Sequence, residues 1–153
     1  MAFLELKIPP VLFFTILAVL MWLTSLVFPD SGVNGTLRLA LGLFSLILGA
    51  GIALAGVIEF RRAKTSVNPL NPNNASSVVS KGIFQYTRNP MYLGLLLALF
   101  SWACCLDNLY TLLFVVLFPL YMTRFQIKPE ERLLESNFGK DYALYKTRVR
   151  RWL

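Results

Sequence analysis

Two short polar segments, each at the end of an apolar run, carry the residues of this sequence that could do chemistry. Residues 88–90 read R-N-P, where a polar loop continues directly into an apolar stretch, and residues 128–132 read K-P-E-E-R after a later apolar stretch. Charged and amide groups at a membrane boundary are costly to bury, and they more often mark a functional site than packing. We therefore predict that the two segments meet and form a cofactor site at the face of a membrane.

The acids of the second segment, together with nearby aromatic residues, suit a positively charged ligand that bears a nucleoside. Carboxylates can accept hydrogen bonds from ribose or amino groups, and aromatic faces attract cations. A purely structural role for Glu130 and Glu131 is the alternative, because acids are favoured in the first turn of a helix and can pair with arginines. The candidate partners are Arg88, Arg124 and Arg132.

The sequence contains no histidine, which removes the commonest general base and a usual zinc ligand. Its two cysteines, Cys104 and Cys105, are adjacent within an apolar run and lack the spacing of metal ligands, so we predict no metal site. A reaction that needs a base would have to use Glu131, Tyr86 or Tyr92, although interfacial anchoring is the commoner role for a tyrosine at such a position.

The composition is that of an integral membrane protein. Of the 153 residues, 56% are hydrophobic and only 15% are charged, whereas roughly 25% of a soluble domain is charged. The net charge of +7 could suggest nucleic acid as a partner, but the basic residues fall between apolar runs instead of forming one stripe. We therefore expect one compact membrane domain over residues 1–153 that does not bind nucleic acid.

Four apolar runs predict an all-α protein with four transmembrane helices. The runs cover residues 9–28, 37–60, 88–106 and 109–127. The third is long enough to cross a bilayer only if its helix begins near Thr87. Lysine and arginine gather in residues 61–88 and in the C-terminal region, whereas the turns at residues 29–36 and 107–108 have none. The positive-inside rule therefore predicts cytoplasmic termini, a cytoplasmic loop at residues 61–87 and a cytoplasmic site.

The pattern of residues 129–149 predicts an amphipathic helix at the C-terminus. Pro129 should end the fourth run, because the residue before a proline avoids helical geometry, and it suits the first position of the next helix. Apolar residues recur at steps of three to four and form one stripe: Leu133, Leu134, Phe138, Tyr142, Tyr145 and Val149. We expect this helix to lie along the anionic membrane surface, with a break at Gly139.

Two stretches of the sequence resemble a known family. They read S-S-V-V-S-K-G-I-F-Q-Y-T-R-N-P-M-Y-L-G from Ser76 and P-E-E-R-L-L-E-S-N-F-G-K-D-Y-A-L-Y from Pro129. An R-(H/N)-P-x-Y-x-G box, followed by a glutamate pair before an F-G-x-x-Y-x-x-Y run, is similar to the isoprenylcysteine carboxyl methyltransferase and phospholipid methyltransferase superfamily. The resemblance implies a small membrane enzyme that uses S-adenosylmethionine without a Rossmann domain.

The resemblance also implies which residues hold the cofactor. Carried over position by position, they are Ser76, Ser77, Val78, Val79, Phe84, Asn89, Pro90, Met91, Tyr92 and Glu130. The eukaryotic box has histidine at the position of Asn89. Asparagine can still donate and accept hydrogen bonds, but it cannot titrate.

The same resemblance bears on the acceptor. In the carboxyl methyltransferases an arginine for the substrate carboxylate is expected one helical turn before the cofactor glutamate, and here Gln126 holds that position. Arg124 lies two residues earlier, on a different side of a regular helix. Our catalytic candidates are Arg124, Glu131 and Tyr92.

We expect methyl transfer from S-adenosylmethionine, with S-adenosylhomocysteine as product, to a lipid-like acceptor whose reactive group is a carboxylate, an amine or a thiol. The sulfonium already activates the methyl group, so the protein's task is chiefly positioning. We further expect a bacterial inner-membrane location and membrane lipids as partners, and a homo-oligomer is compatible with the sequence.

Two other classes of protein compete with this interpretation. A small transporter or an assembly subunit could use the polar segments for gating or packing, but a transporter should carry an ionisable residue in mid-membrane, and the centres of the apolar runs have none. A sterol-reductase-like enzyme would bind a nicotinamide cofactor instead, although chains of that group are much longer.

Overall fold

The computed structural model describes residues 5–63 and 78–153, and within them every regular element is a helix. The main helices are α1 (Pro10–Val27), α2 (Gly35–Arg62), α3 (Pro90–Leu106), α4 (Leu112–Tyr121) and α5 (Lys128–Arg148). Three shorter elements connect them: η3 (Gly82–Gln85), η4 (Leu109–Thr111) and the π-helical turn η5 (Met122–Ile127). The predicted all-α membrane fold is confirmed, since three to four of these helices are apolar enough to span a bilayer.

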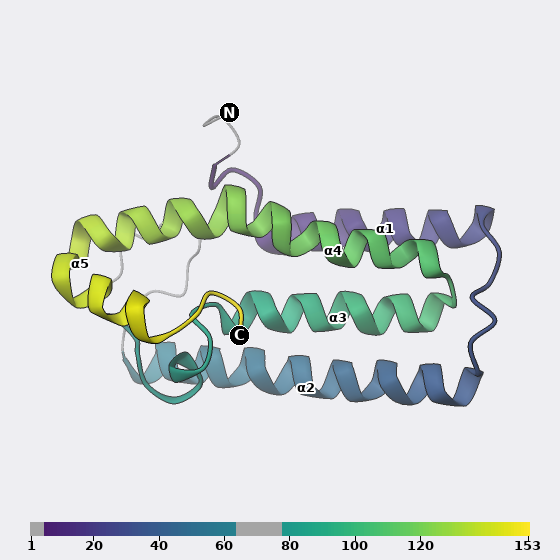
Figure 1. Ribbon diagram of the computed structural model, residues 1–153, viewed down its shortest axis with the longest axis horizontal. Coiled ribbons are helices and arrows are strands. Elements are labelled where there is room, and N and C mark those ends of the chain that lie inside the picture. Colours follow the sequence, from purple (N-terminus) through teal and green to yellow (C-terminus); the bar gives the residue numbers. More distant parts are fainter. Residues whose placement is uncertain (1–4, 64–77) are drawn as a thin grey trace.

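Helices α1 to α4 lie side by side, and α5 extends beyond one end of this bundle (Figure 1). The core between α1, α3 and α4 consists of buried apolar residues: Leu17, Met21, Tyr92, Leu99, Ala103, Phe118, Met122 and Ile127. The opposite faces of α1, α2 and α4 expose leucine, isoleucine, valine and phenylalanine, as expected of surfaces that contact lipid. The bundle therefore holds α3, whose first turn carries the box, between the other helices.

Helices α2 and α3 pack closely along a seam of small residues. Gly42, Gly49 and Gly56 recur every seven residues on the buried face of α2. A Cβ atom added to Gly49 would lie 2.8 Å from the Leu97 Cβ and 2.9 Å from the carbonyl oxygen of Gly94. Small residues let two membrane helices approach in this way.

Helix α3 begins at Pro90, three residues later than the start near Thr87 that the sequence suggests. Asn89 has φ −130° and ψ 57°, outside the helical region, and Pro90 occupies the first helical position. Proline is favoured there because its missing N–H would have no partner within the helix. Residues 87–89 are therefore not helical, and their polar groups are available to other segments.

The prediction that Pro129 ends the fourth helix is wrong. Helix α4 continues through η5 into α5, and Ile127 and Lys128 both keep helical dihedral angles. Pro129 has no N–H to give to the carbonyl of Phe125, four residues earlier, and that carbonyl instead accepts a hydrogen bond from the Leu6 N–H at 3.1 Å. The π turn and the N-terminal segment together accommodate the proline.

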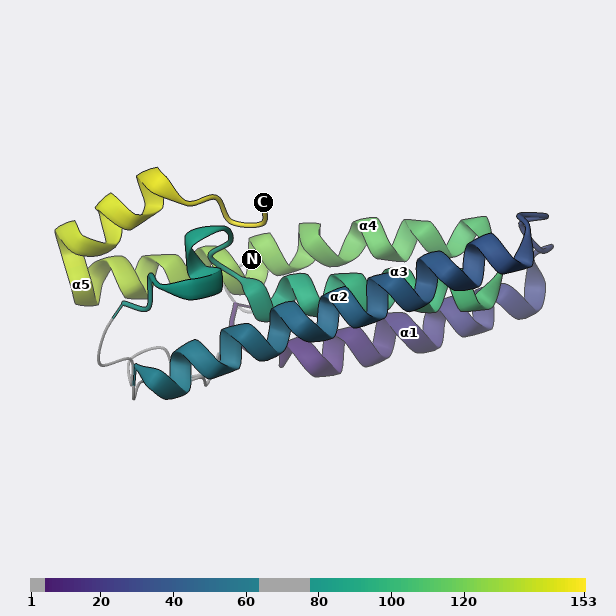
Figure 2. The same ribbon diagram turned by 90° about the horizontal axis from the view of Figure 1, so that it is seen from below.

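The apolar stripe of helix α5 packs inside the protein, whereas the sequence predicts that it faces the membrane surface. Gly139 has φ 51° and ψ −120°, which breaks the helix as predicted and turns its second half back toward the bundle (Figure 2). The apolar stripe then packs inside the protein, where Tyr142, Tyr145 and Val149 form a buried cluster with Phe84 of η3. The long α2 reaches the same region, where Phe60 meets Phe84 edge-on with ring centroids 5.2 Å apart.

Two alanine substitutions on α2 test the packing seam. Replacing glycine by alanine in a helix interior normally stabilises the folded protein by about 1 kcal/mol. We expect that gain for Gly51→Ala, because no heavy atom lies within 4 Å of the added Cβ. Gly49→Ala should instead destabilise by about 1–3 kcal/mol, because its Cβ would overlap α3. Unfolding in detergent, followed by circular dichroism, measures both; equal effects would contradict the seam.

Candidate functional site

The two polar segments meet in the structure, as the sequence predicts. The Tyr92 hydroxyl, in the first turn of α3, donates a hydrogen bond to the Glu130 Oε1 at 2.6 Å, and the Arg88 Nη2 lies 3.0 Å from the Glu131 Oε1. The continuous helix through η5 carries Glu130 and Glu131 to the start of α3. Residues about forty positions apart in the sequence thus form one polar site at the end of the bundle from which α5 extends.

Glu130 is half-buried and accepts two hydrogen bonds on the same oxygen. Besides the Tyr92 hydroxyl, the Gln126 Nε2 donates to the Glu130 Oε1 at 2.7 Å, and Gln126 itself is buried. Desolvation raises the pKa of Glu130 to about 7, although the hydrogen bonds from Tyr92 and Gln126 act to lower it. A neighbouring cation would strongly stabilise the ionised form of this carboxyl group, because the described residues place no positive charge against it.

Glu131 is held between two guanidinium groups. The Arg151 Nε donates to Oε1 at 2.9 Å and its Nη2 to Oε2 at 2.8 Å, while Arg88 pairs with Oε1. The Glu131 side chain is 7% exposed and that of Arg88 9%. Glu131 therefore has the structural role that the sequence offered as an alternative, an ion pair with Arg88. Arg151 is a second partner that the sequence did not indicate.

The C-terminal tail, residues 149–153, crosses the first polar segment. The Arg88 N–H donates to the carbonyl of Arg150 at 3.0 Å, and the carbonyl of Arg151 accepts from the Thr87 hydroxyl at 3.1 Å and from the Asn89 Nδ2 at 3.0 Å. The asparagine of the box therefore fixes the tail through its amide N–H. A neutral histidine could offer a single N–H donor in its place.

The remaining predicted cofactor residues divide between three places. Val78, Val79 and Phe84 contact the aromatic cluster of α5, and the Tyr145 hydroxyl donates to the Phe84 carbonyl at 2.7 Å. Pro90 and Met91 pack on α2 at Gly56. Ser76 and Ser77 lie outside the described residues.

Arg124 is not part of this group. Its Nη1 lies 3.2 Å from the Glu5 Oε1, and Arg132 pairs with the other oxygen of the same carboxylate. The Arg124 side chain is 45% exposed. Of the three catalytic candidates, the structure thus brings Glu131 and Tyr92 into the site and leaves Arg124 with the N-terminal segment.

Four residues of the site were not predicted as members: Thr87, Gln126, Arg151 and Trp152. The sequence marks Gln126 only as the position where an arginine is expected, and Arg151 lies beyond the predicted helix of residues 129–149. The contacts of Arg151 and Trp152 depend on the reversal at Gly139, which brings a distant part of the chain onto the box.

The fold and the site define an integral membrane protein with a polar, acid-bearing site at one end of its helical bundle. The phospholipid methyltransferase family matches residues 37–141, more than half of the chain, and the protein belongs to this family. An uncharacterized protein of Haemophilus influenzae is 51% identical over 63 residues, which are 41% of this chain and the whole of that protein. No solved structure matches the chain. The family implies methyl transfer to a lipid-type acceptor.

Replacing Glu130 by glutamine should change stability in a pH-dependent way. The pKa of Glu130 in the folded protein, about 7, lies above its ordinary value of 4.5, so the protonated form favours folding and this contribution is lost as pH rises from 4.5 through 7. Glutamine mimics the neutral acid. We expect Glu130→Gln to melt above the wild type at pH 8 and equal to it at pH 4.5; a difference independent of pH would contradict the burial of this carboxyl.

Removing the charge of Glu131 should lower the free energy of unfolding far more than removing the charge of Glu135. Glu131→Gln leaves the buried Arg88 without its partner, and breaking a buried pair costs about 3–5 kcal/mol. Glu135 pairs with Lys146 at the surface and is 47% exposed, so Glu135→Gln should cost below about 1 kcal/mol. Chemical unfolding in detergent compares the two variants, and similar losses would show that the buried pair does not hold the site together.

Proposed function

We propose that this protein transfers a methyl group from S-adenosylmethionine to a lipid-like acceptor at the cytoplasmic membrane face. The observation that carries the proposal is the contact between Tyr92 and Glu130, which joins the box to the acidic segment within a chain of the phospholipid methyltransferase family. Neither segment alone presents both an acid and the start of a membrane helix.

The residues at the site fit this cofactor. Glu130 is poised to accept a hydrogen bond from a cationic or hydroxyl-bearing ligand, because its second oxygen, Oε2, receives none of the hydrogen bonds from Tyr92 and Gln126. Val78 and Val79 are partly exposed and supply apolar surface for a nucleobase, whereas Phe84 is buried behind them in the aromatic cluster. When bound, S-adenosylmethionine supplies an activated methyl group, and the chain's own residues orient it and exclude water.

The placement of Arg124 favours an amine or a thiol over a carboxylate as the acceptor group. A carboxylate acceptor calls for a cation beside the transferred methyl group, but Arg124 pairs with Glu5, and Gln126 in the expected arginine position binds Glu130. An amine or thiol must lose a proton, and Glu130 has a pKa near 7 that suits it to take up that proton. Both oxygens of Glu131 are engaged by arginines, which assigns it a positioning role.

The distribution of charge supports a site on the cytoplasmic side of a bacterial inner membrane. Arg61, Arg62 and Lys128 lie at the end of the bundle that bears the site. At the opposite end Arg38 is paired with Asp107 and donates to the carbonyl of Cys105, so its charge is locally compensated. The positive-inside rule then directs the site to the cytoplasm.

Calorimetric titration of the purified protein in detergent tests the proposal. S-adenosylmethionine and S-adenosylhomocysteine should bind in the micromolar range, whereas NADPH should not. The affinity for S-adenosylmethionine should fall up to about tenfold per pH unit below pH 7, because Glu130 must ionise to accept the cation. Binding of NADPH alone would instead favour a reductase. If none of the three ligands binds, a transporter or an assembly subunit would be favoured.

Two variants and one control test which residues bind the cofactor. Glu130→Ala removes the carboxylate and should weaken binding of S-adenosylmethionine by at least about tenfold, since a charge-assisted hydrogen bond is lost. Asn89→Ala should also weaken it, because the box loses its contact with the tail. Glu135→Ala removes an exposed acid from the same helix and should bind normally. Normal binding by both site variants would refute the residue assignment.

A further inference from the structure

The N-terminal segment before α1, residues 5–9, contacts the π turn η5 beside the candidate site (Figure 1). The Leu6 N–H donates a hydrogen bond to the carbonyl of Phe125 at 3.1 Å. Pro129 lacks the N–H that would bind this carbonyl in a regular helix, so Leu6 replaces a donor that α5 does not have. A segment from the other end of the chain thus completes the hydrogen bonding of the turn that precedes Glu130.

An ion pair holds the same segment in place. The Glu5 Oε1 lies 3.2 Å from the Arg124 Nη1, and the Glu5 Oε2 pairs with Arg132. The Glu5 side chain is 17% exposed, whereas the two arginine side chains are 45% and 61% exposed. Arg124 precedes Gln126 in the sequence, and Arg132 follows Glu130. One carboxylate therefore bridges the stretch of helix that contains both of these site residues.

The carbonyl that Leu6 binds belongs to the peptide group in which Gln126 begins. A peptide group is planar, so a bond that fixes the Phe125 carbonyl also fixes the direction of the Gln126 backbone N–H. The Gln126 side chain is buried and donates to the Glu130 Oε1 at 2.7 Å. Single π turns within α-helices are frequent at functional sites, where they change the direction of a side chain. The position of the Gln126 donor therefore depends on the N-terminal segment.

The backbone of Leu6 shows that this contact is enforced. Leu6 has φ 57°, in the left-handed region, which costs free energy for a residue with a side chain. A residue keeps such a conformation only where the surrounding contacts determine it, and such residues cluster at functional sites. Here the bound Phe125 carbonyl and the ion pairs of Glu5 supply those contacts.

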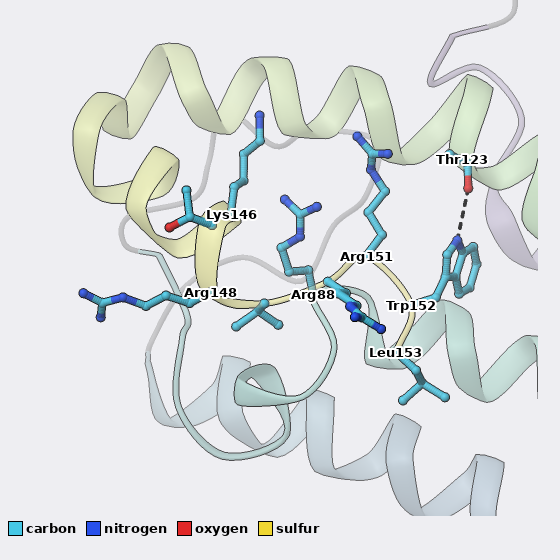
Figure 3. Close-up of a pocket in the computed structure, with 10 residues that line it drawn as sticks. Arg88, Thr123, Lys146, Arg148, Arg151, Trp152 and Leu153 are labelled. Atoms are coloured by element: carbon cyan, nitrogen blue, oxygen red, sulfur yellow. Dashed lines mark hydrogen bonds between the residues drawn. The ribbon is translucent and has the colours of Figure 1, made fainter.

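The C-terminal tail contacts the same turn at another point. The Trp152 indole N–H donates to the Thr123 hydroxyl at 3.1 Å (Figure 3). That contact lies near the start of the turn, whereas the N-terminal contact lies at the peptide group of Gln126. Building on the cofactor role proposed above for Glu130, we propose that Glu5 and Leu6 are positioning residues. They hold the π turn in the conformation that directs Gln126 onto the carboxylate that binds the cofactor.

The ionisation of Glu130 reports on the position of Gln126. Burial raises the pKa of Glu130 to about 7, and the hydrogen bonds from Tyr92 and Gln126 act to lower it. The neighbouring Glu131 acts to raise it, and Tyr142, from the second half of α5, is a further titratable group that senses the charge of Glu130. Displacement of the Gln126 donor would therefore raise the pKa of Glu130 and lower the fraction that is ionised at pH 7.

Two substitutions of Leu6 test the proposal. Leu6→Pro removes the N–H donor, whereas Leu6→Gly keeps it and relieves the left-handed conformation. In Leu6→Pro we expect the calorimetric affinity for S-adenosylmethionine to fall up to about tenfold at pH 7 and to recover toward that of the wild type at pH 9. Leu6→Gly should bind as the wild type does. Equal affinities of the two variants, or a loss in Leu6→Pro that is the same at both pH values, would overturn the proposal.

A matched pair of variants tests the carboxylate of Glu5. Glu5→Gln breaks the link to Arg124 and Arg132, and Asp107→Asn breaks the pair with Arg38 at the opposite end of the bundle. Both variants should remain folded by circular dichroism, because these carboxylate–arginine pairs are partly exposed. Glu5→Gln should shift the pH dependence of S-adenosylmethionine binding toward higher pH, and Asp107→Asn should not. An equal shift in both, or none in Glu5→Gln, would contradict the role of Glu5.

The pKa of Glu130 can also be measured without cofactor, which separates this proposal from the proposed function. ¹³C NMR of protein labelled at the glutamate carboxyls gives that pKa, once Glu130→Gln has assigned the resonance. A higher pKa in Leu6→Pro than in the wild type supports the positioning role, even if the wild type fails to bind S-adenosylmethionine and the proposed function is refuted. An unchanged pKa would overturn the positioning role, whether or not the cofactor binds.

Discussion

The ion cluster of Arg88, Glu131 and Arg151, centred on the buried carboxylate of Glu131, is the interaction on which the site depends. Each charge lies at the start of a helix or in the tail, and each is placed by a different part of the chain. A buried carboxylate is tolerated only when it is paired, and here two guanidinium groups share it. The cluster therefore links the start of α3, the start of α5 and the C-terminal tail in one arrangement, beside which Glu130 is positioned.

Two features of the backbone make this cluster geometrically possible. The π turn η5 carries the helix past Pro129 without a break, so that α5 extends beyond the end of the bundle as a continuation of α4. Gly139, with its positive φ, then reverses the chain and returns Tyr142, Tyr145 and the tail to the box. Glycine adopts this conformation without the steric penalty that a side chain would bring.

Neighbouring acids have separate roles in this site. Glu131 is neutralised by arginines and maintains the architecture, whereas Glu130 accepts hydrogen bonds from the uncharged Tyr92 and Gln126 and has a pKa near neutrality. The difference arises because adjacent positions on a helix point about 100° apart, toward α3 in one case and toward the tail in the other. One helix start thereby provides both a structural anchor and a carboxyl available to a ligand.

The sequence by itself determined the all-helical membrane fold and the break at Gly139, because hydropathy and the placement of a glycine are local properties of the chain. It also predicted that the two polar segments meet, since their flanking charges require the same membrane side. The start of α3, the continuity of the helix through Pro129 and the pairing of Glu131 with Arg151 were decided by tertiary structure. Each depends on contacts with a distant segment: Leu6 with Phe125, or Arg151 with Glu131. Such contacts leave no periodic signal in the sequence.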